Sequence, residues 1–214
     1  MGYVDMFLGL RCAPDVLGVC GPMKGASKEI TEAVAVTSRV RKWALKNPMQ
    51  YSMLDLCAGN ALSSVLGVMY LPLKDAIAVD KKARKRNWDK VDRFDYITMD
   101  IYDKNIFDMI DEQTIITSIH PCKRAAMRVV EIFNNSDAPY LIMVPCCVQR
   151  DSINRERLPT IIREKFGTHE QWSYFLSTKI EGAEVNIMQD HYCLSPRNIV
   201  ITAVRKETSN EKTS

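Results

Sequence analysis

Residues 51–62 constrain the fold of this chain more than any other stretch. An apolar run ends at residues 55–56, a turn of small residues follows at 57–61, and a second apolar segment begins at Leu62. A buried parallel strand that leads through a tight turn into a helix has this pattern. Ligands of open α/β sheets bind beyond the carboxyl ends of the strands, and Gly59 has no Cβ to keep a ligand from the backbone. The stretch therefore predicts the first strand, the ligand-binding turn and the following helix of such a sheet.

The turn is a poor match to a dinucleotide-binding motif. A G-x-G-x-x-G pattern would need glycines at 57, 59 and 62, and the chain has Cys57, Gly59 and Leu62 there. Asp55, at the tip of the predicted strand, would also repel a diphosphate. A ligand with positively charged or amino groups suits this position better, and S-adenosylmethionine carries both a sulfonium and an α-ammonium group. A structural strand–turn–helix without a ligand is the alternative.

Similar short apolar runs recur along the chain. Four further strands are expected, at residues 76–79, 96–99, 114–119 and 140–144. Helices are expected at residues 62–70, 126–133, 158–166 and 170–180. Two β-rich runs, 184–193 and 198–204, predict an antiparallel hairpin. This order predicts an α/β fold with a Rossmann-like, doubly wound, seven-stranded sheet, mostly parallel with a reversed C-terminal hairpin strand.

The ends of the chain are expected to differ from its centre. Residues 1–25 contain glycines and prolines without clear periodicity, which predicts an irregular N-terminal arm. Ser27 can cap a helix, and apolar residues recur from there at helical spacing until Pro48. One folded domain is expected over residues 26–205. The polar residues 206–214 predict a disordered tail.

Charge and cysteine content limit the classes of protein to consider. The net charge of +3 permits an anionic partner without requiring one. No apolar run reaches the roughly 18 residues that a membrane helix needs, and the N-terminus lacks the pattern of a signal peptide. We therefore expect a cytoplasmic protein without a membrane partner, either a monomer or a weak homo-oligomer.

The seven cysteines form no C-x-x-C pair, and their odd number favours free thiols in a reducing compartment. A zinc site would need scattered ligands such as Cys12, Cys20 or His191. No metal site is therefore expected.

Three of the predicted strands end in an acid, namely Asp55, Asp80 and Asp100. The carboxyl ends of parallel strands meet at one edge of a sheet, so the three carboxylates are expected to face one crevice. Asp80 lies near the position where an acid binds ribose hydroxyls in nucleotide-binding sheets. Asp100 could accept a hydrogen bond from an adenine amino group, and the Ile101 N–H could serve a ring nitrogen. Any single one of these acids could instead be a helix cap.

With its acid, small residues and Gly59, the turn resembles the first motif of the class I methyltransferases, and the likeness covers roughly residues 26–205. His120-Pro-Cys122 and Val144-Pro-Cys-Cys147 look like one branch, which has a His-x-Cys-Gly motif after strand four and vicinal cysteines after strand five. This branch includes the eukaryotic tRNA ribose 2′-O-methyltransferases, and residues 195–198 are similar to its members as well. The chain departs from it at Lys123, which replaces a glycine, and in a first motif reduced to Gly59.

The pattern and the resemblance together predict S-adenosylmethionine as cofactor and a set of site residues. Cofactor contacts are expected from Asp55, Cys57, Ala58, Gly59, Asn60, Asp80, Lys81, Asp100 and Ile101. The acceptor side is expected to comprise Pro121, Cys122, Cys146, Cys147, Arg150, Arg155 and Arg157. The vicinal cysteines could be nucleophiles or small side chains that line a tight pocket.

His120 and the basic residues of the chain bear on the identity of the methyl acceptor. His120 is the expected catalytic residue, a base for a hydroxyl acceptor, and the alternative is that it only shapes the pocket wall. No Asn-Pro-Pro-aromatic motif follows residues 114–119, which disfavours an exocyclic base amine. Arginines after the fifth strand make RNA a reasonable partner, whereas the basic run 81–86, expected to begin a helix, is interpreted as solvated surface. A small-molecule or protein acceptor, or a catalytically silent cofactor-binding module, remains an alternative.

Overall fold

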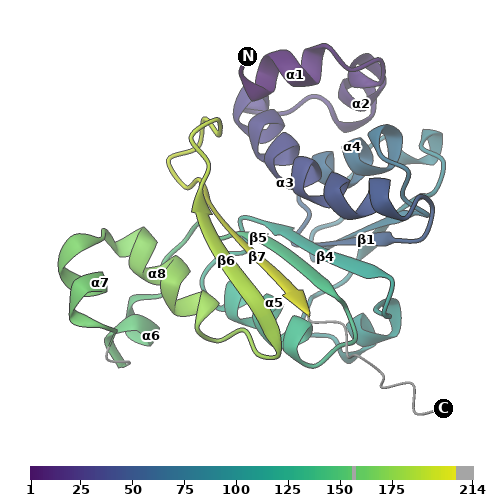
Figure 1. The fold of residues 1–214 in the computed structure, drawn as a ribbon. Helices are drawn as coiled ribbons and strands as arrows, with labels where there is room; N and C mark the ends of the chain where they lie inside the picture. The colour runs from purple at the N-terminus through teal and green to yellow at the C-terminus, as the bar shows by residue number, and fades with distance from the viewer. Residues whose placement is uncertain (156–157, 206–214) are drawn as a thin grey trace.

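The computed structural model describes residues 1–155 and 158–205, and within them a seven-stranded sheet forms the centre of the fold (Figure 1). The strands are β1 (Ser52–Leu56), β2 (Ala76–Asp80), β3 (Phe94–Thr98), β4 (Thr114–Ile119), β5 (Tyr140–Val144), β6 (Ala183–Gln189) and β7 (Ile199–Arg205). Their order is β3-β2-β1-β4-β5-β7-β6. All neighbours are parallel except β7, which runs antiparallel to β5 and β6. The predicted fold class is confirmed.

Helices cover both faces of the sheet (Figure 1). They are α1 (Tyr3–Leu8), α2 (Ala13–Cys20), α3 (Ala26–Lys46), α4 (Leu62–Tyr70), α5 (Arg124–Asn134), α6 (Arg150–Arg155), α7 (Thr160–Lys165) and α8 (Thr168–Ser177). Alternate residues of β1 point to opposite faces, so Met53 packs with α3 and α4 while Leu54 packs with α5 and α8. Burial on both faces explains why the central strands are continuous apolar runs in the sequence.

The N-terminal segment is not irregular, as the sequence suggested, because it forms α1 and α2. Several of its glycines and prolines lie at helix ends: Gly2 precedes α1, Gly9 follows it, and Pro14 occupies the first turn of α2. Pro and Gly are compatible with these positions and do not interrupt a helix there. Phe7 and Val16 are fully buried, so both helices belong to the core on the α3–α4 side.

Two smaller expectations about helix starts are also wrong. The residue that precedes α3 is Gly25, in the left-handed region with φ 78°, and not Ser27. The basic run 81–86 does not begin a helix; a short 3-10 helix, η1, follows it at Trp88–Lys90. Trp88 of this short helix stacks on Tyr96 of β3, with ring centroids 3.8 Å apart.

Most of the other strand and helix boundaries lie within a few residues of those predicted from the sequence. β4 and β5 have the predicted residues, whereas β3 begins two residues earlier than expected and leaves Asp100 in the following loop. The predicted tail, 206–214, lies outside the described residues. Within residues 1–155 and 158–205, no helix is both long and apolar enough to cross a membrane.

Candidate functional site

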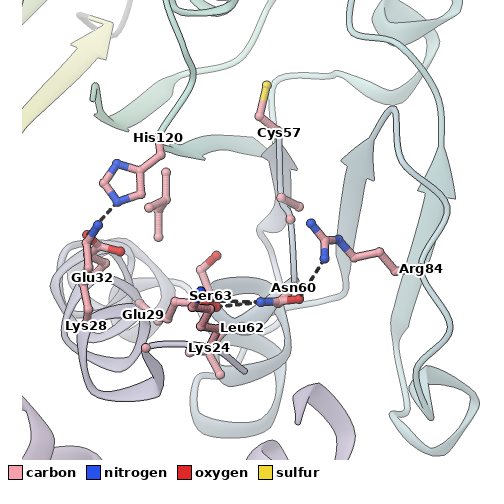
Figure 2. Close-up of a pocket in the computed structure, with 15 residues that line it drawn as sticks. Lys24, Lys28, Glu29, Glu32, Cys57, Asn60, Leu62, Ser63, Arg84 and His120 are labelled. Atoms are coloured by element: carbon pink, nitrogen blue, oxygen red, sulfur yellow. Dashed lines mark hydrogen bonds and ion pairs between the residues drawn. The ribbon is translucent and has the colours of Figure 1, made fainter. Parts of the chain in front are cut away.

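A cavity of about 330 Å³ opens beyond the carboxyl ends of β1 and β4. Its lining comes from the turn after β1 with the start of α4, from the start of α3 with the residues before it, from Arg84 in the loop after β2, and from residues 119–120 at the end of β4. Figure 2 shows the side chains that converge on it from these segments. Of the predicted site residues, the lining includes Cys57, Ala58, Gly59, Asn60 and His120.

The turn after β1 has an unusual backbone that explains its small residues. Cys57, Gly59 and Ala61 all lie in the left-handed region, with φ of 62°, 56° and 57°. A Cβ added at Gly59 would meet no atom within 4 Å, so the backbone here faces open space. Cys57 holds a conformation that favours glycine and therefore carries backbone strain.

Asp80 fixes this turn from the tip of β2. Its Oδ2 accepts a hydrogen bond from the Gly59 N–H at 2.9 Å, and its Oδ1 accepts one from the Lys82 N–H at 2.9 Å. A carboxylate has about four lone-pair sites, so further donors can still bind to it.

Other residues predicted to contact a cofactor lie farther along the same edge. Asp100 is exposed and its Oδ1 accepts from the Tyr102 N–H at 3.1 Å. Ile101 is buried, and its carbonyl accepts from the Arg128 side chain at 3.0 Å. Neither residue lines the cavity, and Lys81 lines a neighbouring hollow. These three residues therefore lie outside the cavity lining, although burial raises the pKa of the Cys57 thiol in the turn and the charge of Asp100 adds to this rise.

Asp55 does not face the crevice, where the sequence placed it. Its side chain is buried, and the hydroxyls of Ser63 and Ser64 donate to its Oδ2 at 2.5 and 2.8 Å. Burial raises the pKa of Asp55 to about 6, although these hydrogen bonds act in the opposite direction. Asp55 thus joins the end of β1 to the first turn of α4 from inside the fold.

His120 forms a close pair with an acid of α3. His120 Nε2 lies 2.6 Å from Glu32 Oε1, and Lys28 Nζ lies 3.8 Å from the same oxygen (Figure 2). The Glu32 side chain is only 3% exposed. An ionised Glu32 can accept only, so Nε2 carries the proton and Nδ1 is the basic atom of this tautomer. Nδ1 is buried and has no hydrogen-bond partner among the residues that the structure describes.

Glu32 is a functional candidate that the sequence pattern missed, because helical spacing put it on the polar face of α3. The structure buries this part of α3 beneath residues of the β6–β7 connection. The Leu194 N–H donates to the Thr31 hydroxyl at 3.1 Å, and the Cys193 thiol lies 3.7 Å from the Thr31 carbonyl. A contact between residues so far apart in sequence leaves no local signal.

The loops after β4 and β5 meet beside His120. The His120 N–H donates to the Val144 carbonyl at 2.8 Å, and the Lys123 N–H donates to the Cys147 carbonyl at 3.2 Å. Lys123 has φ 49° and ψ −113°, a backbone conformation dominated by glycine. Lys123 stands where the His-x-Cys-Gly motif has its glycine. It therefore adopts a backbone conformation that favours glycine, and its backbone is strained.

The predicted acceptor-side residues gather around these loops in part. Pro121 is buried, and the thiols of Cys122, Cys146 and Cys147 lie together. Arg150 is exposed at the start of α6, Arg155 is the last residue of that helix, and Arg157 lies outside the described residues.

Two open hollows of about 600 and 510 Å³ adjoin the loops after β4 and β5. Their basic lining residues are Lys81, Lys123, Arg124, Arg128 and Arg150, and their acidic ones are Glu131 and Asp151. Arg128 is already paired with Glu131 at 2.9 Å. The remaining basic residues outnumber the remaining acidic one, so the residues that line the two hollows carry a net positive charge.

The scattered cysteines considered as zinc ligands do not meet. In residues 1–155 and 158–205, Cys12, Cys20 and His191 form no group close enough to share an ion. Cys20 is fully buried, and burial raises the pKa of its thiol to about 12. It has the character of a core residue.

Known structures share this fold at low sequence identity. The methyltransferase domain of bacterial CtHen1-CN is 13% identical with a TM-score of 0.52, and the match covers 79% of this chain and 97% of that one. The plantazolicin methyltransferase BamL, solved with SAH, is 10% identical with a TM-score of 0.51 and coverages of 94% and 94%. The 23S rRNA methyltransferase ErmE is 10% identical with a TM-score of 0.51 and coverages of 81% and 68%.

A search of curated proteins finds no match. A family model described as a methyltransferase domain matches residues 26–152. This match covers the turn after β1, Glu32, His120 and the vicinal cysteines. Because it spans more than half of the chain, the protein belongs to this methyltransferase domain family.

Proposed function

We propose that the protein transfers the methyl group of S-adenosylmethionine to RNA, with a ribose hydroxyl as the favoured acceptor. One observation carries the proposal: open hollows with a basic rim adjoin the loop of His120, next to the cavity of the β1 turn. Phosphates of a nucleic acid bind to such cations, and an open edge admits a large acceptor.

The cavity has a charge pattern that suits the methionine end of the donor. Glu29 and Glu32 line it together with Lys24, Lys28 and Arg84 (Figure 2). The methionine end carries an α-ammonium, a carboxylate and a sulfonium, so both signs of charge find complementary groups here. The open space at Gly59 leaves room for the ligand against the backbone. Asp80 would accept hydrogen bonds from the ribose hydroxyls, with Asp100 and Ile101 toward the adenine.

Within this arrangement His120 is the proposed base and Glu32 its positioning residue. A hydroxyl acceptor loses a proton during methyl transfer, and a neutral imidazole can take it up. Glu32 would hold the ring in one tautomer and stabilise the imidazolium that forms. Since Nδ1 is buried in the chain without substrate, acceptor binding must open a path to it or release Nε2 from Glu32.

The proposal is tested with fractionated cellular RNA and methyl-labelled S-adenosylmethionine. A 2′-O-methyl group blocks alkaline cleavage of the adjacent phosphodiester, so label that survives alkali in dinucleotides identifies the ribose product. Label recovered in base-modified nucleosides would contradict the ribose assignment. Label in protein or small molecules would contradict RNA as acceptor, and donor binding without turnover on any pool would favour a silent module.

A further inference from the structure

Three thiols from two loops form a compact cluster beside the proposed site. The sulfur of Cys122 lies 3.1 Å from that of Cys146 and 3.3 Å from that of Cys147, and the last two are 3.4 Å apart. Cys122 and Cys147 are exposed, and Cys146 is partly buried. The sulfurs thus form a nearly equilateral triangle that solvent can reach.

The fold assembles this triangle in advance. β4 and β5 are paired in parallel with Ile119 opposite Val144, so the residues just beyond both strands lie side by side. The backbone hydrogen bonds from His120 to Val144 and from Lys123 to Cys147 hold the two loops together. Little conformational entropy would therefore be lost if the three sulfurs bound one ligand.

We propose that Cys122, Cys146 and Cys147 form a three-thiolate site for a soft d¹⁰ cation, Zn²⁺, whose fourth coordination position is open to solvent. The sequence argued against a metal site because the cysteines form no C-x-x-C pair. The ligands instead come from two segments that only the strand register brings together.

The spacing of the sulfurs favours an ion over a disulfide. Sulfurs around a tetrahedral zinc lie about 2.3 Å from the ion and hence about 3.8 Å apart. Each pair in the cluster would have to separate by roughly half an ångström to reach that spacing. A disulfide would require one pair to approach to about 2.05 Å and would leave the third thiol unused.

The charges around the cluster also suit a bound cation. Soft thiolate ligands select zinc and similar ions. Binding forms three S–Zn bonds and releases up to three thiol protons to solvent, with no change in oxidation state. Three thiolates and Zn²⁺ leave one net negative charge, and the cations of Lys123 and Arg197 act on Cys147. Burial raises the pKa of Cys122 and Cys146, whereas hydrogen bonds from their thiols lower that of Cys147.

The test uses the full chain, freed of metal by a chelator and kept reduced. Dialysis against micromolar Zn²⁺ should leave about one ion per chain, and Co²⁺ in its place should give the thiolate charge-transfer and visible bands of a tetrahedral site. Cys122→Ser, Cys146→Ser and Cys147→Ser should each weaken binding by more than about tenfold, since loss of even an outer-shell partner costs 10–100-fold. Cys12→Ser, at the start of α2, is the matched control and should bind as the parent does.

A second measurement needs no variant. Alkylation of Cys122 and Cys147 in the parent should slow when Zn²⁺ is added, while alkylation of Cys12 should not. Full binding by any of the three cluster variants, or unchanged alkylation with Zn²⁺, would overturn the proposal. A chain that takes up no ion when reduced but loses two hydrogens in air would show that the cluster is a disulfide centre instead.

Discussion

Replacement of Asp55 by Asn should change how the stability of the chain depends on pH. Asp55 is fully buried, and burial raises its pKa from 3.8 to about 6. Between these two values the folded chain holds a proton that the unfolded chain releases, so the parent loses stability as pH rises, and the loss is complete above about pH 6. The difference between 3.8 and about 6 corresponds to about 3 kcal/mol.

The assay is urea unfolding of both proteins at pH 4 and pH 7, with Asp89→Asn as a control for the loss of one surface charge. The free energy of unfolding of Asp55→Asn, measured relative to the parent, should increase by about 3 kcal/mol between the two pH values. Protonated Asp and Asn are close in shape, so the two proteins should differ least at pH 4. A difference that is independent of pH, or that moves in the opposite direction, would refute the reasoning. The second result would mean that Ser63 and Ser64 stabilise the carboxylate more than burial penalises it.

Three further predictions concern strain, chemistry and the acceptor surface. Cys57→Gly and Lys123→Gly should each raise the free energy of unfolding by about 1 kcal/mol, because both residues hold glycine conformations; lower stability in urea titrations would contradict this. His120→Gln should lower turnover on the true acceptor by about 10²–10⁴-fold, with little change in cofactor affinity. Glu32→Gln should lower turnover by a smaller factor. Full turnover in His120→Gln would show that His120 only shapes the wall of the pocket. Arg124→Gln with Arg150→Gln should weaken RNA binding and reduce its salt slope by about 0.7 per lost phosphate contact. Equal slopes for variant and parent would exclude this surface.

The sequence predicted the fold well where burial is complete. β4, β5 and α4 have the predicted residues, because parallel strands covered on both faces are apolar throughout and the turns between them are polar. It failed at α1 and α2, where glycines and prolines that mark helix ends resembled an irregular arm.

The candidate site was predicted in part, and the missing parts are tertiary. The turn at Cys57–Asn60 and His120 meet at one cavity, as strand-end residues of a parallel sheet should. Glu32 could not be found, because its partner His120 lies 88 residues away in the sequence. The burial of Asp55 depends in turn on how α4 begins, which the acid-tipped pattern does not specify.

The central claim, that the cavity beside Gly59 holds the methyl donor, is tested most directly by titration calorimetry with S-adenosylhomocysteine. The parent should bind it, and Gly59→Ala should bind at least tenfold more weakly, because the added Cβ projects into open space at the cavity wall. Gly182→Ala is the control for a Gly→Ala change at positive φ: Gly182 has φ 66° and does not line the cavity, so the affinity of this variant should equal the parent's even though the added Cβ would lie 3.1 Å from Arg205 Nη1. Absence of binding to the parent at millimolar ligand, or equal affinity of Gly59→Ala and the parent, would contradict the account.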